Sequence, residues 1–398
     1  MNGAWIDVDL DAVRSNYRSV LGLLHPGARV MAVVKADAYG LGAVEVARTL
    51  QGEGCSAFAV TTVVEGLLLR EHGIKGVILV LGPADRNELP QALTGRLHLT
   101  LSSIAQLEAL QDVAEQMEVK AEVHLKLETG MGRTGFSPEE LPELARCLQD
   151  AHFIKVEGTY THLARAGQRD QAYTKNQYDQ FIADVNVLAK AGIEPRWQHV
   201  CNSAGFLDYP EWHLDFVRVG TLLIGHLPGL GFRGRLTLTD PWAARCRIIS
   251  LRKVPQGTHV GYQSVYRTRR ETQLAVIPLG YADGFGVEPR LIPQGLVDLL
   301  KIFIKNTALW LGFSLGQDKL TLNGYVVRVA GKIGMQLTVL DVGLQACRLG
   351  DVVEVPLRRA SANPRLPRRY WSEGRILSER CMKEGFLLLS PEYPTSAE

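Results

Sequence analysis

One repeating unit fills the sequence between residue 29 and about residue 225: a short run of β-branched and apolar residues followed by a longer helical pattern. Such alternation predicts parallel strands joined by helices. The runs with strand character are RVMAVVKADA, SAFAVTT, GVILVLG, LHLTLSS, KAEVHLKLET, FIKVEGTYTH, RWQHVCNS and FVRVGTLL. Eight units in roughly 200 residues favour a TIM (β/α)8 barrel, although periodicity alone also allows an open doubly wound sheet.

A different pattern follows residue 235, where apolar and polar residues alternate between polar turns. This pattern is typical of antiparallel strands and predicts a mostly β domain at 236–398, after a barrel domain at 1–235. We expect the first strand of the chain to pack with the C-terminal domain. The Arg- and Pro-rich stretch 360–375 is expected to form extended surface structure.

Composition and charge exclude several classes of partner. The chain has 44 basic and 42 acidic residues, so it lacks the field that would attract nucleic acid or an anionic membrane, and a small ligand is expected. Six scattered cysteines indicate neither a disulfide framework nor a metal site. The apolar run 296–313 contains Asp298, Lys301 and Lys305, which argue against a membrane span. The acidic N-terminus does not resemble a signal peptide, so we expect a cytoplasmic protein.

Lys35 stands near the carboxyl end of the first barrel run, in VVKADAYGLG. TIM barrels place their catalytic residues at this end of the strands. Lysine is rarely buried without a role, because removing an ammonium group from water is costly, and burial favours the neutral amine that forms Schiff bases. From this segment alone, a catalytic lysine and a snorkelling or ion-paired lysine are equally good interpretations.

Segments along nearly the whole chain resemble the alanine racemase family of fold-type III enzymes, which use pyridoxal 5′-phosphate (PLP). AVVKADAYGLG resembles the family's cofactor-lysine motif. The segments HLKLETGMGRTGF, YTHLARA, HVCNSAG, RVGTLL, VGYQSVY, PLGYADGF and VAGKIGM then follow in the family's order. A single chance motif would not produce this shared order. The resemblance implies PLP on Lys35 and interconversion of L- and D-alanine, which supplies D-alanine as a peptidoglycan precursor.

The resemblance also implies a set of cofactor-binding residues: Lys35, Tyr39, His162, Asn202, Ser203, Arg218, Gly220 and Thr221. Hydroxyl and backbone N–H groups after the seventh and eighth strands lie where TIM barrels commonly bind phosphate, although a loop requirement would also explain each small residue. Arg218 resembles the arginine that faces the pyridine nitrogen. Its permanent charge would disfavour protonation of that nitrogen. An ion pair between Arg218 and Asp215 is the structural alternative.

Racemisation needs a proton-transferring group on each face of the substrate's α-carbon, because a single group tends to return the proton to its original side. Lys35 can serve one face. The resemblance implies that Tyr262 serves the other from a partner subunit, with His162 and Arg218 assisting it. We therefore expect a homodimer with shared active sites. A lone tyrosine in a strand is otherwise usually a packing residue.

The remaining site residues follow from the same resemblance. Arg133 resembles the arginine that holds the substrate carboxylate, and Tyr281 and the main chain at Met335 resemble further substrate contacts. Strand alternation in KAEVHLKLETG points Lys126 into the barrel. Two cations close together need an anion between them, which the family provides by carbamylating the lysine. A pair of Lys126 with Glu128 is the alternative.

The chain departs from the family pattern in places that bear on the substrate. Gln336 and Leu337 stand where the family usually has Asp-Gln after the methionine, and the late tyrosine at the site entrance is absent from the tail. An inserted segment near 286–322 is expected to add a helix. Two other functions therefore stay open: racemisation of another amino acid, such as serine or a basic one, and non-catalytic PLP binding.

Overall fold

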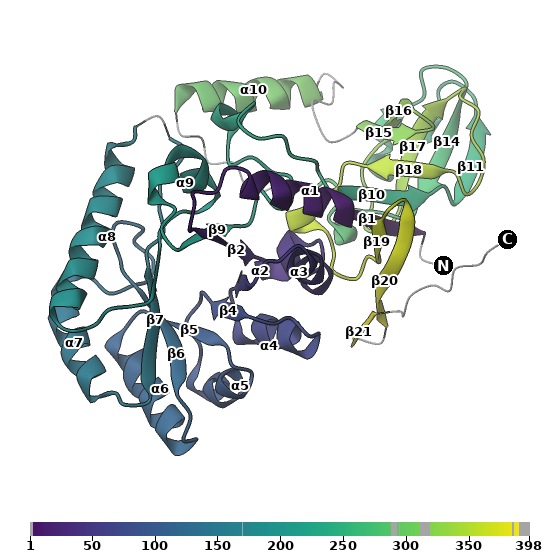
Figure 1. Ribbon diagram of the computed structural model, residues 1–398. Coiled ribbons are helices and arrows are strands. Elements are labelled where there is room, and N and C mark those ends of the chain that lie inside the picture. Colours follow the sequence, from purple (N-terminus) through teal and green to yellow (C-terminus); the bar gives the residue numbers. More distant parts are fainter. Residues whose placement is uncertain are drawn as a thin grey trace. The chain divides into compact units, whose positions relative to one another are not determined.

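The computed structural model describes residues 3–168, 170–287, 293, 295–310, 319–383 and 386–389. The chain divides into two compact units (Figure 1). Leu10–Pro241 forms one unit, and Met1–Asp9 together with Trp242–Glu398 forms the other. Within the described ranges, no helix combines the length and the apolar character that crossing a membrane requires.

The unit Leu10–Pro241 is a nearly closed parallel barrel, as predicted. Its strands run in the order β8-β7-β6-β5-β4-β3-β2-β9. The two outer strands of this order meet through backbone hydrogen bonds, from Asp215 N to Gln198 O at 3.1 Å and from Arg218 N to Cys201 O at 2.9 Å. The strands are β2 (Arg29–Val33), β3 (Ala57–Val60), β4 (Val77–Val80), β5 (His98–Leu101), β6 (Ala121–Lys126), β7 (Ile154–Tyr160), β8 (Trp197–His199) and β9 (Phe216–Val219).

Helices α3 to α8 lie on the outer side of these strands (Figure 1). A capping box formed by Ser137 and Glu140 precedes α7, with Ser137 N donating to the Glu140 carboxylate at 2.8 Å. The helices are α1 (Leu10–Leu21), α3 (Ala43–Gly52), α4 (Val63–Glu71), α5 (Leu89–Thr94), α6 (Ile104–Gln116), α7 (Leu141–Asp150), α8 (Ala172–Lys190) and α9 (Ser203–Asp208).

A left-handed turn, α2 (Lys35–Tyr39), directly follows the first barrel strand. Ala36, Asp37, Ala38 and Tyr39 all have positive φ, between 50° and 57°. Left-handed conformation costs an L-residue about 1–2 kcal/mol, so the surroundings must stabilise it. Asp37 Oδ1 accepts from Ala43 N at 2.9 Å, and the Glu65 carboxylate accepts from Ala36 N at 2.6 Å. Backbone strain of this kind concentrates at functional sites.

The second unit is built on a mostly antiparallel sheet, which confirms the predicted β domain. Its order is β11-β14-β17-β16-β15-β18-β10-β1-β19-β20-β21, with β1 antiparallel to β10 and parallel to β19. The strands are β1 (Ala4–Asp9), β10 (Trp242–Arg247), β11 (Ser250–Val254), β14 (Thr272–Ile277), β15 (Lys319–Leu322), β16 (Tyr325–Val329), β17 (Thr338–Gly343), β18 (Val352–Val355), β19 (Arg368–Ser372), β20 (Arg375–Lys383) and β21 (Phe386–Leu389). A separate hairpin joins β12 (His259–Val260) and β13 (Tyr266–Arg267).

The described part of the expected insertion near 286–322 contains the helix α10 (Leu296–Trp310). Residues 288–292, 294 and 311–318 of this insertion lie outside the described residues. The expectation that 360–375 lies on the surface was wrong in part, because β19 is paired on both sides and the side chains of Arg368 and Tyr370 are buried. Burial of Arg368 is compensated by hydrogen bonds to the carbonyl oxygens of Asn363, Pro364 and Leu366.

Replacing Ala36 by glycine tests the left-handed turn. Glycine tolerates positive φ, so A36G relieves strain of about 1–2 kcal/mol, which offsets the roughly 0.5–1 kcal/mol that glycine usually costs. We expect its melting temperature, Tm, to equal or exceed that of the parent. The control is A183G, at an exposed site in the right-handed helix α8, which we expect to lose about 1 kcal/mol. Equal losses in Tm for the two variants would contradict the left-handed backbone conformation at Ala36.

Candidate active site

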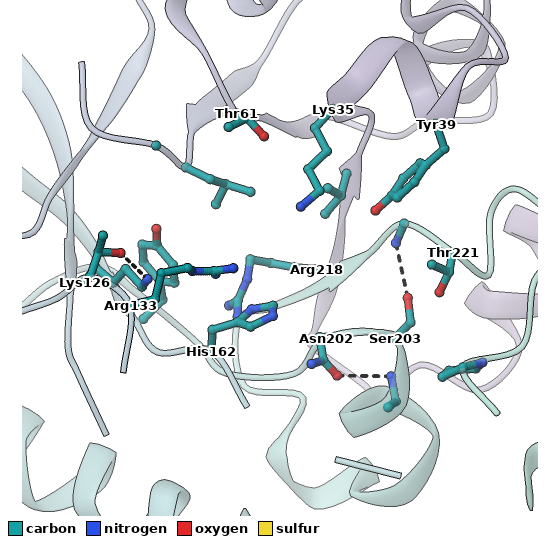
Figure 2. Close-up of a pocket in the computed structure, with 18 of the residues that line it drawn as sticks. Lys35, Tyr39, Thr61, Lys126, Arg133, His162, Asn202, Ser203, Arg218 and Thr221 are labelled. Atoms are coloured by element: carbon teal, nitrogen blue, oxygen red, sulfur yellow. Dashed lines mark hydrogen bonds between the residues drawn. The ribbon is translucent and has the colours of Figure 1, made fainter. Parts of the chain in front are cut away.

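A cavity of about 600 Å³ opens at the carboxyl ends of the barrel strands (Figure 2). Its volume suits a small organic ligand. The lining comes entirely from the barrel unit. It consists of Val33, Lys35, Tyr39, Thr61, Leu81, Gly82, Pro83, Lys126, Arg133, Thr134, Tyr160, His162, Asn202, Ser203, Ala204, Arg218, Gly220, Thr221 and Pro228.

Every site residue that the sequence predicts within the barrel unit lines this cavity. They are Lys35, Tyr39, Lys126, Arg133, His162, Asn202, Ser203, Arg218, Gly220 and Thr221. Figure 2 labels all of them except Gly220 and shows the labelled side chains reaching in from several strand ends, with the Lys35 amine extended toward Arg218 and His162. The barrel therefore assembles these residues from positions far apart in the sequence.

The other three predicted residues, Tyr262, Tyr281 and Met335, belong to the second unit. Their exposed fractions are 75%, 49% and 59%. Tyr281 N donates to Gly334 O and Ala282 N donates to Met335 O, each at 3.0 Å, so Tyr281 and Met335 lie close together. Tyr262 begins the short turn Tyr262–Ser264 after β12.

The cavity is strongly cationic. Lys35, Lys126, Arg133 and Arg218 line it, and its described lining includes no aspartate or glutamate. Burial, with the charges of these four cations, lowers the pKa of His162 to about 3, so its imidazole stays neutral at physiological pH. Cations that converge without acidic partners favour an anionic ligand.

Arg218 is almost fully buried, with 4% of its surface exposed. Its Nη1 donates to the ring Nδ1 and the carbonyl of His199, both at 2.8 Å, and its Nη2 donates to Thr161 O and Val200 O at 2.6 and 3.1 Å. Among the described residues, only its Nε–H is left without a protein acceptor. Asp215 instead accepts from Gln198 N at 2.7 Å. The alternative that the sequence left open, an ion pair between Arg218 and Asp215, is therefore not observed among the described residues. Burial lowers the pKa of Arg218 to about 10, which keeps it charged at neutral pH.

Small residues and hydroxyls form the part of the cavity beside Tyr39. Gly220 N donates to Ser203 Oγ at 3.3 Å. A Cβ atom on Gly220 would lie 2.2 Å from the Tyr39 hydroxyl oxygen, so any other residue there would displace the Tyr39 side chain. Asn202 caps α9 by accepting from Ala204 N at 3.1 Å. Hydroxyl and backbone N–H groups gathered in this way suit phosphate oxygens.

Lys126 is buried beside a loop that Glu128 organises. The Glu128 carboxylate accepts the backbone N–H groups of residues 130–133. Burial opposes ionisation of Glu128, but these hydrogen bonds prevail and lower its pKa. The alternative pair of Lys126 with Glu128 is not formed among the described residues. Lys126 donates instead to Thr134 Oγ1 at 2.5 Å, and burial together with the Arg133 charge lowers its pKa to about 8.

Sequence reasoning missed several lining residues. Thr61 follows β3, and Leu81, Gly82 and Pro83 follow β4. Because TIM barrels place their sites at the carboxyl ends of strands, the residues that follow each predicted strand were the available signal. The described residues contain no cluster of three or more His, Cys, Asp or Glu side chains suited to a metal ion.

Comparisons with known proteins agree with this architecture. The chain matches the family model for the alanine racemase N-terminal domain over residues 8–228 and that for the alanine racemase C-terminal domain over residues 242–364. It is 32% identical over 354 residues to alanine racemase from Methanococcus maripaludis, covering 88% of each chain. It is 35% identical over 343 residues to alanine racemase from Desulforamulus reducens, covering 85% of each.

Solved structures show the same likeness. A structure of alanine racemase from Clostridium difficile 630 matches with a TM-score of 0.85 at 27% identity, covering 96% of this chain and 99% of that one. Both domain models, both relatives and this structure span most of the sequence in one order. The chain belongs to the alanine racemase family.

Proposed function

We propose that this protein is a PLP-dependent alanine racemase. The observation that carries the proposal is the barrel cavity, in which the Lys35 amine lies among cations with no acidic residue in the described lining. PLP presents a phosphate at one end and an aldehyde that condenses with amines, and an amino acid presents a carboxylate. Relatives named alanine racemase support the choice of alanine.

The cavity residues fit PLP in charge and in chemistry. Tyr39, Ser203, Gly220 and Thr221 would hold the phosphate, at the place where a Cβ on Gly220 would collide with Tyr39. Asn202 would lie beside them, and Lys35 would carry the cofactor. When bound, PLP supplies an electron-withdrawing ring that stabilises negative charge at the substrate's α-carbon.

Arg218 would face the pyridine nitrogen of the cofactor. Its hydrogen bonds to carbonyls and to His199 consume four N–H groups and leave Nε–H for a ligand. A guanidinium that stays charged opposes a proton on that nitrogen. We infer that Arg218 moderates the ring's electron withdrawal and so favours return of a proton to the α-carbon over other reactions.

Proton transfer is assigned to Lys35 on one face of the α-carbon and to Tyr262 of the partner subunit on the other. The proposed unit is a homodimer, as the resemblance to the family implies. Tyr262, Tyr281 and Met335 belong to the second unit, whereas the described cavity lining comes from the first. Arg133 would hold the substrate carboxylate, with Tyr281 and the main chain at Met335 as further contacts. His162, which is neutral, would assist Tyr262 through hydrogen bonding.

A second candidate function is racemisation of a different amino acid, such as serine or a basic one. Gln336 and Leu337 favour it, because they replace a carboxylate beside the proposed substrate contacts, and Leu337 is 54% exposed. The non-catalytic alternative, a PLP-binding protein, would need Lys35 to carry the cofactor but would not need Tyr262.

Incubating the PLP-loaded protein with a panel of L-amino acids in deuterated water separates these functions. We expect L-alanine to exchange its α-hydrogen and to lose its chirality. Faster racemisation of serine or a basic amino acid would favour the second candidate. Exchange without loss of chirality for every amino acid would refute the two-base assignment, and no exchange at all would leave the non-catalytic alternative.

Replacing Tyr262 by phenylalanine tests the second base. Y262F removes the hydroxyl from one face of the α-carbon, and loss of such a group typically costs about 10²–10⁴-fold in rate. We expect racemisation to fall by that factor, while Lys35 still exchanges the α-hydrogen of one enantiomer with retention. The matched control is Y325F, at an exposed tyrosine of the same unit, which should racemise like the parent. Parental racemisation by Y262F would rule out this role.

Lys126 is proposed to carry a carbamate, which would supply an anion between Lys126 and Arg133. The N–C bond forms between the neutral Nζ and CO₂, and one proton leaves to solvent. Because the pKa of Lys126 is lowered to about 8, the neutral amine becomes abundant as pH rises through that value.

With ¹³C-labelled bicarbonate, we expect a carbamate resonance that strengthens from about pH 6 to about pH 9, as the amine loses its proton. K126M should abolish the resonance. K155M, at a half-exposed surface lysine, should keep it. A parent spectrum that lacks the resonance, together with an unmodified mass under mild conditions, would disprove the carbamate.

A further inference from the structure

Three buried histidines occupy the barrel interior, where branched aliphatic side chains usually pack. His98 comes from β5, His124 from β6 and His199 from β8, and their exposed fractions are 6%, 0% and 0%. They stand beside an apolar cluster that includes Trp197 and Phe216. Buried polar side chains are costly unless they are hydrogen-bonded, so this arrangement calls for an explanation.

The three imidazoles form a continuous hydrogen-bonded chain that starts at Arg218. Arg218 Nη1 lies 2.8 Å from His199 Nδ1. His199 Nε2 lies 2.9 Å from His124 Nδ1, and His124 Nε2 lies 3.3 Å from His98 Nδ1. The last ring nitrogen, His98 Nε2, lies 3.2 Å from a carboxylate oxygen of Glu122. Glu122 and His98 stand at the amino ends of their strands, opposite the end that bears the cavity.

The Arg218 guanidinium at one end of the chain determines which nitrogen donates and which accepts in every hydrogen bond between the rings. A guanidinium only donates, so His199 Nδ1 must accept and the ring proton must lie on its Nε2. That proton is donated to His124 Nδ1, which places the His124 proton on Nε2 in turn. The same step places the His98 proton on Nε2, where it is donated to the carboxylate. All three rings are therefore neutral Nε2–H tautomers, and burial lowers the pKa of each.

The strands make specific room for the middle ring. A Cβ atom on Gly158 of β7 would lie 2.2 Å from His124 Nδ1. The register between β6 and β7 shifts at this point, where Val123 faces Val156 but His124 faces Gly158. Tyr160 stacks on His199 with centroids 4.9 Å apart and planes at 6°, which fixes that ring. A bulge and a glycine at one position indicate that the chain of rings is built into the fold.

We propose that His98, His124 and His199 are positioning residues that orient the Arg218 guanidinium and link it to the Glu122 carboxylate across the barrel. Each neutral ring turns its acceptor nitrogen toward Arg218 and its N–H toward Glu122, so the dipoles align along the chain. Hydrogen bonds aligned in this way polarise and strengthen one another. That Arg218 faces the cofactor in the cavity rests on the proposed function. The hydrogen-bonded chain from Arg218 through the three histidines to Glu122, which we call the relay, does not rest on it.

The tautomers can be measured directly. In ¹⁵N-histidine-labelled protein, with and without PLP, long-range ¹H–¹⁵N spectra should show His98, His124 and His199 as neutral Nε2–H tautomers. E122Q should shift the ring nitrogens of His98 and, through the links, those of His199. The control E157Q alters a carboxylate that also pairs with Lys155 but gives His98 no hydrogen bond in the described chain. An Nδ1–H tautomer at any of the three, or a shift that stops at His98, would overturn the relay.

A pair of substitutions at His199 tests whether the relay acts through Arg218. H199L removes the acceptor for Nη1, and we expect a kcat at least about tenfold lower, with an altered absorbance band of the bound cofactor. H199N offers an amide oxygen at the position of Nδ1 and should restore the band and part of kcat. Equal bands in H199L and the parent would contradict the proposal. The tautomer spectra need no turnover, so they distinguish failure of the relay from failure of the proposed racemase.

Discussion

A permanently charged guanidinium buried at the barrel mouth constrains the rest of this structure. Moving such an ion out of water costs several kcal/mol unless its N–H groups find acceptors. The acceptors of Arg218 are the carbonyls of Thr161, His199 and Val200 and one ring nitrogen of His199. They all come from the carboxyl ends of β7 and β8. The chain must therefore place these carbonyl groups at the carboxyl ends of β7 and β8, within reach of the guanidinium. For the same reason β9, which carries Arg218, must lie against β8.

The acidic side chains near the cavity are held by backbone N–H groups and leave its cations unneutralised. Glu128 accepts four N–H groups of the loop that bears Arg133. Glu65 accepts those of Ala36, Thr61 and Thr62, and so ties the left-handed turn after Lys35 to the start of α4. Carboxylates fixed in this way shape the loops and stand outside the described lining, so the lining has cationic side chains and no acidic ones.

Sequence patterns predicted the barrel because βα periodicity and strand-end positions are local signals. They placed Lys35 at the carboxyl ends of the strands, where barrel enzymes have their sites, whereas Arg218 was assigned to the same site through the resemblance to the family. The left-handed turn at Ala36 was not predictable, since alanine has no preference for positive φ and the turn depends on Glu65, a distant residue. The histidine chain was missed for a similar reason. Strand alternation makes His124 an inward residue, but its partners lie on β5 and β8, and no local pattern encodes that these three inward side chains meet in the barrel interior.

The charges around His162 limit how the proposed second base can work. Burial and four surrounding cations hold the pKa of His162 at about 3, so this imidazole does not carry a proton at neutral pH. It can orient a hydroxyl by hydrogen bonding but cannot stabilise a tyrosinate by charge. That stabilisation must come from fixed cations, and Arg218 and Arg133 both lie in the same cavity. The chain of neutral rings behind Arg218 leaves its positive charge directed toward the cavity, where a developing phenolate would need it.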